Sequence, residues 1–139
     1  MPVEDLVRTD PIAATQKASI AEVASLMAEF GVGSVVIEDD GLPVGIVTDR
    51  DITIDVTAEG RDPEGVLAED VMTEDPVTVE RDTGVYELIE IMAENSVRRI
   101  PVVEDGELYG IVTLDDLDRL LGDEQRKLGQ VIEAESPPY

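Results

Sequence analysis

The sequence contains two copies of one unit, offset by 65 residues. The segment GLPVGIVTDRDI at 41–52 returns as GELYGIVTLDDL at 106–117, with six of its twelve residues unchanged. Other identities keep the same offset without a gap, so that Asp10-Pro11 matches Asp75-Pro76 and Met27-Ala28 matches Met92-Ala93. Because self-similarity at one fixed period marks a duplicated module, we expect two similar units packed against each other.

Neither unit is large enough to bury a good core alone. The chain has 139 residues, of which 42% are hydrophobic, and a module of about 60 residues buries only roughly 60% of its surface. The two units are therefore expected to share one globular body.

No segment approaches the roughly 18 apolar residues of a membrane span, and the first ten residues lack the basic and apolar regions of a signal peptide. We expect no membrane association and a cytoplasmic location.

The composition excludes several kinds of chemistry. The chain has no Cys and no His, which removes disulfides, thiolate nucleophiles, imidazole bases and the usual zinc sites. It also lacks a phosphate-binding Gly-x-x-x-x-Gly-Lys loop and the ligand spacing of a calcium loop. We therefore predict no catalytic residues, no metal site and no catalytic cofactor, so that the protein is not an enzyme.

The net charge of the chain limits the classes of partner that it can bind. The formal net charge is -23, from 33 acidic and 10 basic residues, and only Lys17 and Lys127 are lysines. Nucleic-acid binding depends on a dense basic surface, so we predict no nucleic-acid partner. An acidic, lysine-poor surface favours a halophilic protein, because about 1 M salt screens self-repulsion within ~3 Å. The alternative is an acidic protein from an ordinary cytosol.

Each unit has the hydrophobic pattern of a strand, a helix, a hairpin and a helix. In the first unit, Ser19 precedes a helix whose inner face carries Ile20, Val23, Met27 and Phe30, and Asp40-Gly41 forms the hairpin turn. The expected strands of the first unit are 12–14, 34–37 and 42–47, and its second helix is 49–58. The second unit is expected to have strands at 77–79, 100–103 and 107–112 and helices at 84–95 and 114–121.

These patterns predict a mixed α/β (α+β) fold of two β-α-β-β-α units. Each small sheet is covered by helices on one side, so the bare faces are expected to pack sheet to sheet about a pseudo-twofold axis, with a cleft at each end of the junction. The expected boundaries are 7–58 for the first unit, 59–69 for a linker and 70–122 for the second unit. An acidic tail at 123–139 is expected to be frayed or used in contacts.

Two Thr-x-x-Asp motifs lie where a strand meets a helix: Thr48 with Asp51, and Thr113 with Asp116. A helix N-terminus attracts phosphate, and a carboxylate can accept hydrogen bonds from both hydroxyls of a ribose. The same spacing fits a helix capping box, which stabilises a helix by roughly 0.5 to 2 kcal/mol without any ligand. Both interpretations stay open, although two equivalent motifs at cleft positions favour ligand binding.

Arg98 and Arg99 precede the strand 100–103 in a chain with few cations. Neighbouring strand residues point to opposite faces, so we expect one of the two to enter a cleft, where a guanidinium can hold a phosphate through two hydrogen bonds. The alternative is a surface ion pair. The aligned residues Gly33 and Ser34 are uncharged, so the two clefts are expected to differ in anion affinity. Arg50 either adds a cation to the first motif or is solvated.

Both units resemble the cystathionine-β-synthase (CBS) domain. The segment 71–117, VMTEDPVTVERDTGVYELIEIMAENSVRRIPVVEDGELYGIVTLDDL, is similar to the family pattern from Val-Met-Thr to the closing Gly-x-x-Thr-x-x-Asp. The resemblance covers residues 7–122 and implies a stand-alone tandem CBS pair. The first unit departs from the pattern because it lacks Met-Thr before Pro11 and has no cation at Gly33-Ser34.

The resemblance implies clefts that bind AMP, ADP, ATP or S-adenosylmethionine, often within a homodimer. It assigns ribose contacts to Asp51 and Asp116, ribose or phosphate contacts to Thr48 and Thr113, and a phosphate contact to Arg98. It also brings residues before the opposite unit's first strand toward the adenine: Arg8, Thr9, Val71 and Met72.

We therefore expect a regulatory module that binds an adenosine-bearing ligand and signals a change of shape to its own dimer or to a partner protein. The alternative is an oligomerisation or interaction module in which both motifs are helix caps and no nucleotide binds. An enzyme is the least favoured class.

Overall fold

The structure, a computed structural model, describes residues 1–135. The first unit contains β1 (Ala13–Thr15), α1 (Ile20–Phe30), β2 (Ser34–Asp39), β3 (Leu42–Thr48) and α2 (Asp49–Asp51), which continues as a π-helical turn over Ile52–Thr57. The second unit contains β5 (Val79–Glu80), α4 (Val85–Asn95), β6 (Arg99–Glu104), β7 (Glu107–Thr113) and α5 (Leu114–Glu135). The mixed α+β class and the β-α-β-β-α order predicted from the sequence are confirmed.

Local sequence signals determine where these elements begin and end. The Ser19 side chain accepts a hydrogen bond from the Glu22 backbone N–H at the start of α1, and Gly31 ends that helix with a φ of 63°. Each hairpin turns at an Asp-Gly pair with both φ angles positive, which matches the right-handed twist of the strands.

The repeat extends to the hydrogen-bonded register of the sheets. β1 runs parallel to β2 and β2 antiparallel to β3, just as β5 runs parallel to β6 and β6 antiparallel to β7. Ser34 lies opposite Thr48 in the first hairpin, and Arg99 lies opposite Thr113 in the second. Both members of the second pair follow the first by 65 residues, so the two hairpins are built alike.

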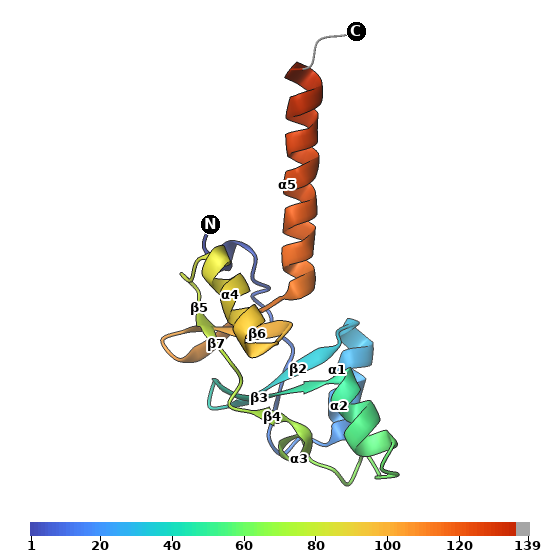
Figure 1. The fold of residues 1–139 in the computed structure, drawn as a ribbon. Coiled ribbons are helices and arrows are strands. Elements are labelled where there is room, and N and C mark those ends of the chain that lie inside the picture. The colour runs from blue at the N-terminus through green and yellow to red at the C-terminus, as the bar shows by residue number, and fades with distance from the viewer. Residues whose placement is uncertain (136–139) are drawn as a thin grey trace.

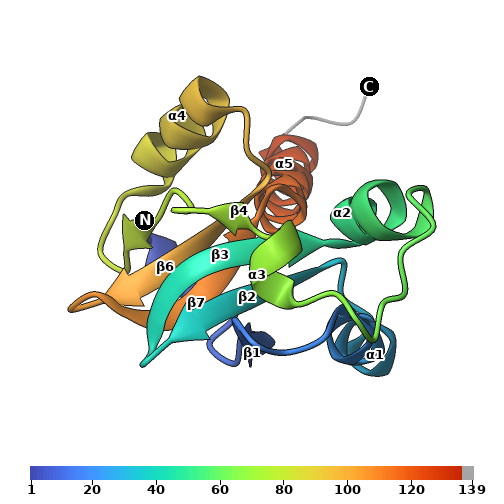
Figure 2. The ribbon, with the colours of Figure 1, turned by 90° about the horizontal axis from the view of Figure 1, so that it is seen from below.

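The two sheets pack against each other, with β3 and β7 in contact. Figure 2 shows the β2–β3 hairpin lying across β6 and β7, with the helices placed around them. Each unit has its own apolar core, formed around residues such as Ile37 and Val47 in the first unit and Ile100 and Val112 in the second. The predicted pairing of two sheet-and-helix units is confirmed.

Each unit is completed by the chain segment that precedes the other unit. A 3-10 turn at Val3–Asp5 buries Val3 fully in the core of the second unit, and Arg8 pairs with Ile111 of β7. In the same way, α3 (Ala68–Val71) packs into the core of the first unit, and β4 (Thr73–Glu74) adds to β3. This exchange ties the units together, and it brings Arg8 to the surface of β7.

A salt-bridge cluster holds the N-terminal segment in place. The Arg81 guanidinium donates to Glu4 at 2.8 Å and to Glu104 at 2.9 Å, and it lies over the Tyr109 ring. The hydrogen bond to Glu4 raises the pKa of Arg81. The N-terminus is thereby connected to β6 and β7.

The structure differs from the prediction at three places. Phe30, expected on the inner face of α1, is 53% exposed because it is the last residue of the helix and lies beyond the core. The strand expected at 77–79 forms only over Val79–Glu80. The last helix does not end at Leu121 but continues to Glu135, as Figure 1 shows, so the tail is not frayed over its described part. The expectation for residues 136–139 lies outside the described residues.

No helix among residues 1–135 is both long enough and apolar enough to span a bilayer.

Candidate functional site

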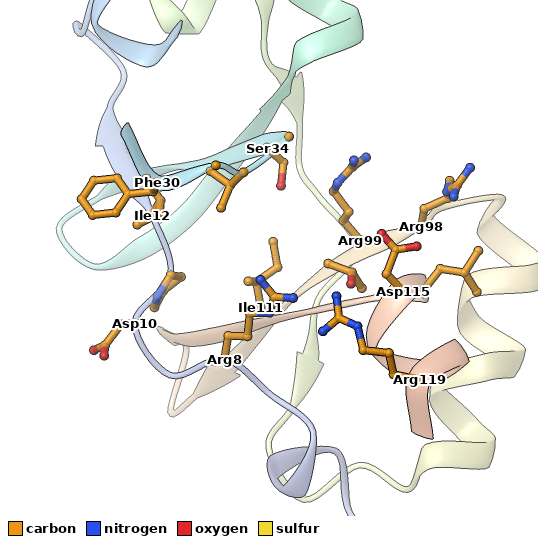
Figure 3. Close-up of a pocket in the computed structure, with 16 residues that line it drawn as sticks. Arg8, Asp10, Ile12, Phe30, Ser34, Arg98, Arg99, Ile111, Asp115 and Arg119 are labelled. Carbon is orange, nitrogen blue, oxygen red and sulfur yellow. The ribbon is translucent and has the colours of Figure 1, made fainter. Parts of the chain in front are cut away.

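A cavity of about 420 Å³ lies at the junction of the two units. The first unit supplies its wall from residues 10–12 and 30–34, and the second unit supplies residues 98–99, 111, 113–115 and 119, with Arg8 from the N-terminal segment. Figure 3 shows the side chains of these two groups facing each other across the opening. A cleft at the junction was expected from the symmetry of the repeat, and this cavity occupies such a place.

Repeat-related residues form opposite walls of this one cavity. Gly33 and Ser34 line one side, and their counterparts Arg98 and Arg99 line the other. The backbone is held alike on both sides, because Asp49 N–H donates to the Gly33 carbonyl and Leu114 N–H donates to the Arg98 carbonyl. The uncharged and the cationic pair therefore lie in a single cavity, as a polar wall facing a cationic one, and the expected difference in anion affinity between two clefts stays a prediction.

Four of the eight arginines of the chain line the cavity: Arg8, Arg98, Arg99 and Arg119. Only one of the adjacent pair Arg98 and Arg99 was expected there, but both line it. Strand alternation does not separate them, because β6 begins at Arg99 and Arg98 still belongs to the preceding turn. Within residues 1–135, neither guanidinium forms an ion pair or a side-chain hydrogen bond. A chain with net charge -23 thus concentrates positive charge at one place.

The second Thr-x-x-Asp motif lies at the edge of the cavity. Thr113 lines it, and Asp116, only 8% exposed, lies directly behind. The Asp116 carboxylate accepts from the Thr113 backbone N–H and hydroxyl, both at 3.0 Å, and the Asp116 N–H donates back to the hydroxyl oxygen at 3.3 Å. The motif therefore forms the capping box of α5, which is the interpretation of this spacing that needs no ligand.

The other oxygen of Asp116 faces two of the cavity arginines. Its Oδ1 lies 3.2 Å from Arg8 and 3.8 Å from Arg119. Arg8 is half exposed but Asp116 is only 8% exposed, so a ligand that displaces Arg8 has to supply a hydrogen bond to Oδ1 in its place, because a buried carboxylate left without a partner is costly.

The position of Arg8 depends on the glycine of the same motif. Arg8 N–H donates to the Ile111 carbonyl at 3.1 Å, and Ile111 N–H donates to the Arg8 carbonyl at 3.2 Å. A Cβ atom on Gly110 would overlap the Arg8 carbonyl oxygen and the Val7 side chain. Glycine in this strand permits close approach of a second backbone.

The first motif is built alike but lies elsewhere. Thr48 and Asp51 form a complete capping box, with hydrogen bonds of 2.8 and 3.1 Å. Neither residue lines the cavity described above. Arg50 is exposed beside them, and its backbone N–H donates to the Asp49 carboxylate.

The remaining predicted residues also lie outside this cavity. Val71 is buried in the core of the first unit, and Met72 packs over Gly45, where a Cβ atom would overlap its side chain. Thr9 is exposed between two lining residues, Arg8 and Asp10.

The lining residues that sequence reasoning missed include Asp10, Phe30, Asp115 and Arg119. Arg119 could have been predicted as a lining residue, since it is one of ten basic residues and lies one helical turn after Asp116.

No three acidic side chains among residues 1–135 are grouped as a metal site would require.

The CBS domain family model matches this chain twice, at residues 3–56 and 68–123. The uncharacterized protein MK0525 of Methanopyrus kandleri is 40% identical over 117 residues, which are 83% of this chain and 60% of that protein. The chain thus spans less than two thirds of the length of this relative.

Two solved structures show the same fold with ligands bound. The CBS domain pair of protein MJ0100, in complex with 5′-methylthioadenosine and S-adenosylmethionine, has a TM-score of 0.78 at 30% identity, covering 87% of this chain and 99% of that one. The CBS domain protein PAE2072 of Pyrobaculum aerophilum, complexed with AMP, has a TM-score of 0.77 at 29% identity, with coverage of 84% and 90%. Together with the repeated sheet-and-helix architecture, these matches establish that the chain belongs to the CBS domain family as a tandem pair.

Proposed function

We propose that this chain is a regulatory module that binds an adenosine-bearing ligand, AMP, ADP, ATP or S-adenosylmethionine, in the cavity between its units. The proposal has support from the relatives, since PAE2072 was solved with AMP and MJ0100 with 5′-methylthioadenosine and S-adenosylmethionine. In this proposal, Asp116 and Thr113 contact the ribose, and Arg98 and Arg99 contact a phosphate. Thr48 and Asp51 would serve an equivalent second site.

One observation carries the proposal for this particular chain. Arg98 and Arg99 line a cavity without any described ion-pair partner, in a protein with 33 acidic residues. An anion bound in the cavity would give these two guanidinium groups a partner of opposite charge that can accept bidentate hydrogen bonds. The start of α5 at Leu114 adds backbone dipoles that favour the same charge.

This charge favours phosphorylated ligands over S-adenosylmethionine. The latter carries a positive sulfonium, which the unpaired Arg98 and Arg99 would repel, whereas ADP brings two phosphates to the same place. We therefore propose AMP, ADP or ATP as the ligand class.

The ligand would act by binding one arrangement of the two units more tightly than another, because only such a difference shifts a conformational equilibrium. The regulated element is then a partner protein or the chain's own oligomer, with no catalytic step.

The alternative is an oligomerisation or interaction module that binds no nucleotide. A specific observation favours it: both Thr-x-x-Asp motifs form capping boxes, and Asp116 is already satisfied by Thr113 and Arg8. In this alternative, the aspartates stabilise helices and nothing more.

Thermal unfolding distinguishes the nucleotide-binding module from the interaction module. A ligand that binds only the folded state stabilises it by about 2.7 kcal/mol at one hundred times its dissociation constant. We expect ADP to raise the melting temperature in molar salt, while adenosine alone raises it less because it brings no phosphate to the arginines. An unchanged melting temperature with AMP, ADP, ATP and S-adenosylmethionine would support the interaction module instead.

A further inference from the structure

Arg8 enters the cavity between the units from a firmly held backbone. Its N–H and carbonyl both pair with Ile111 of β7, at 3.1 and 3.2 Å. Five residues earlier, Val3 is fully buried, and its N–H donates to the Thr83 carbonyl at 2.7 Å. Figure 3 shows the side chain of Arg8 extending from this segment toward Ile111. The fold therefore brings the Arg8 guanidinium to one fixed place at the cavity.

The two oxygens of the Asp116 carboxylate have different partners. Oδ2 accepts from the Thr113 N–H and hydroxyl, whereas Oδ1 accepts from the Arg8 guanidinium at 3.2 Å. Arg119 also approaches Oδ1, but at 3.8 Å it is beyond hydrogen-bonding distance. Among residues 1–135, Arg8 is thus the hydrogen-bond donor to Oδ1. A ligand that uses this oxygen has to compete with Arg8 for it.

The first unit builds the same capping box without such a cation. Asp51, the counterpart of Asp116, accepts from the Thr48 N–H through Oδ2 at 2.8 Å, and within the described part of the chain its Oδ1 has no hydrogen bond or ion pair. The residue that aligns with Arg8 is Thr73, which is exposed. The capping box therefore forms without an arginine, so the contact of Arg8 with Asp116 is not required by the motif itself.

We propose that Arg8 is an internal competitor of the ligand, which occupies Oδ1 of Asp116 in the free chain and is replaced only by a ligand with two adjacent hydroxyl groups. This inference rests on the proposed function, because that function assigns the ribose to Asp116. Hydroxyl groups can donate to the carboxylate in place of the guanidinium, whereas an ionised phosphate or an apolar group has no donor to offer. Arg8 is thus a specificity-determining residue that selects ligands with an intact ribose.

The burial of the two side chains favours an exchange of partners over a simple opening of the ion pair. Asp116 is buried, so its carboxylate is costly to leave without a donor. Arg8 is half exposed, so the released guanidinium can return to water. The carboxylate therefore changes partner only when the ligand supplies the replacement hydrogen bond.

Calorimetric titration of adenosine into the full chain and into Arg8→Met tests the proposal. Methionine keeps a long unbranched side chain but has no donor. We expect Arg8→Met to bind adenosine about fivefold more tightly than the parent, or tighter still, because the competitor for Oδ1 is gone. Arg8→Lys keeps a charged donor and should lie between the two. Adenosine carries no phosphate, so the loss of a cavity cation does not weaken its binding.

Two controls separate competition at Oδ1 from a general effect of charge. Arg119→Met removes the same charge beside the same oxygen, and it should change the affinity for adenosine less than Arg8→Met does, because Arg119 lies beyond hydrogen-bonding distance. The second control is 2′,3′-dideoxyadenosine, which has no ribose hydroxyl at these positions to donate. Arg8→Met should bind it no more tightly than the parent does. Circular dichroism should show all variants folded.

The outcomes distinguish this proposal from the proposed function. If the parent binds ADP but Arg8→Met binds adenosine no more tightly than the parent, Arg8 is not a competitor and the nucleotide site still stands. An equal gain of affinity for adenosine and for 2′,3′-dideoxyadenosine would also overturn the proposal, because the gain would not depend on the ribose hydroxyls. If neither the parent nor Arg8→Met binds adenosine or ADP, the proposed function fails, and the role of Arg8 fails with it.

Discussion

Replacing Asp116 by Ala is expected to weaken ADP binding by about 1.5 to 3 kcal/mol, the usual contribution of a hydrogen bond to a charged group. This corresponds to a loss of affinity of roughly 10- to 150-fold. Asp116 lies directly behind Thr113 at the edge of the cavity, and its Oδ1 faces Arg8. In the proposed complex, this oxygen turns from Arg8 to the ribose hydroxyls. Calorimetric titration of the variant with ADP measures the loss.

The same substitution also removes a helix cap, so a conservative variant is needed to separate the two effects. Asp116→Asn keeps an acceptor oxygen for the Thr113 N–H and removes the charge. We expect its melting temperature to stay close to that of the parent protein and its affinity for ADP to be lower than that of the parent protein. If both variants bound ADP as well as the parent while Asp116→Ala unfolded more easily, Asp116 would be a cap alone.

Replacing Gly110 by Ala is expected to lower the free energy of unfolding by about 3 kcal/mol, near the upper end of the usual cost of overpacking. The added methyl group would overlap the carbonyl oxygen of Arg8 and the side chain of Val7. A backbone atom cannot rotate away, so the N-terminal segment has to separate from β7 and the paired hydrogen bonds between Arg8 and Ile111 are strained. Chemical denaturation of the parent and the variant measures this difference.

The first unit offers a matched control for this substitution. Gly45 is the repeat counterpart of Gly110, but a methyl group there would meet the flexible side chain of Met72 rather than a backbone atom. We expect Gly45→Ala to cost less than Gly110→Ala, because the Met72 sulfur and Cγ can move by a change of rotamer and only the Met72 Cβ, at 2.9 Å, has to shift with its backbone. Equal losses from the two substitutions would show that the contact with the Arg8 backbone has no special importance.

The sequence predicted the arrangement of elements well because the duplication provides its own check. The same turn at Asp40-Gly41 and Asp105-Gly106, and the same spacing of Thr and Asp before each final helix, identified the hairpins and the capping boxes. The exchange of segments between units was not visible in this way. Val3 and Ala68 are buried by contacts distant in sequence, which no local pattern reports.

The candidate site was predicted only in part for the same reason. Arg98, Thr113 and the nearby Asp116 were found because they belong to motifs. Arg119 and Phe30 line the cavity through the packing of one unit on the other. The extension of α5 was missed because the charged residues after the helix 114–121 were expected to form a tail, whereas the structure continues the helix through Gly122 at a cost of about 1 kcal/mol relative to Ala.

Calorimetric titration of the folded parent protein in molar salt, with AMP, ADP, ATP and S-adenosylmethionine in turn, tests the central claim most directly. The account predicts saturable binding of at least one phosphorylated adenosine, tighter than that of S-adenosylmethionine and weakened when Arg98 and Arg99 are both replaced by Gln. Absence of binding by all four compounds would contradict it.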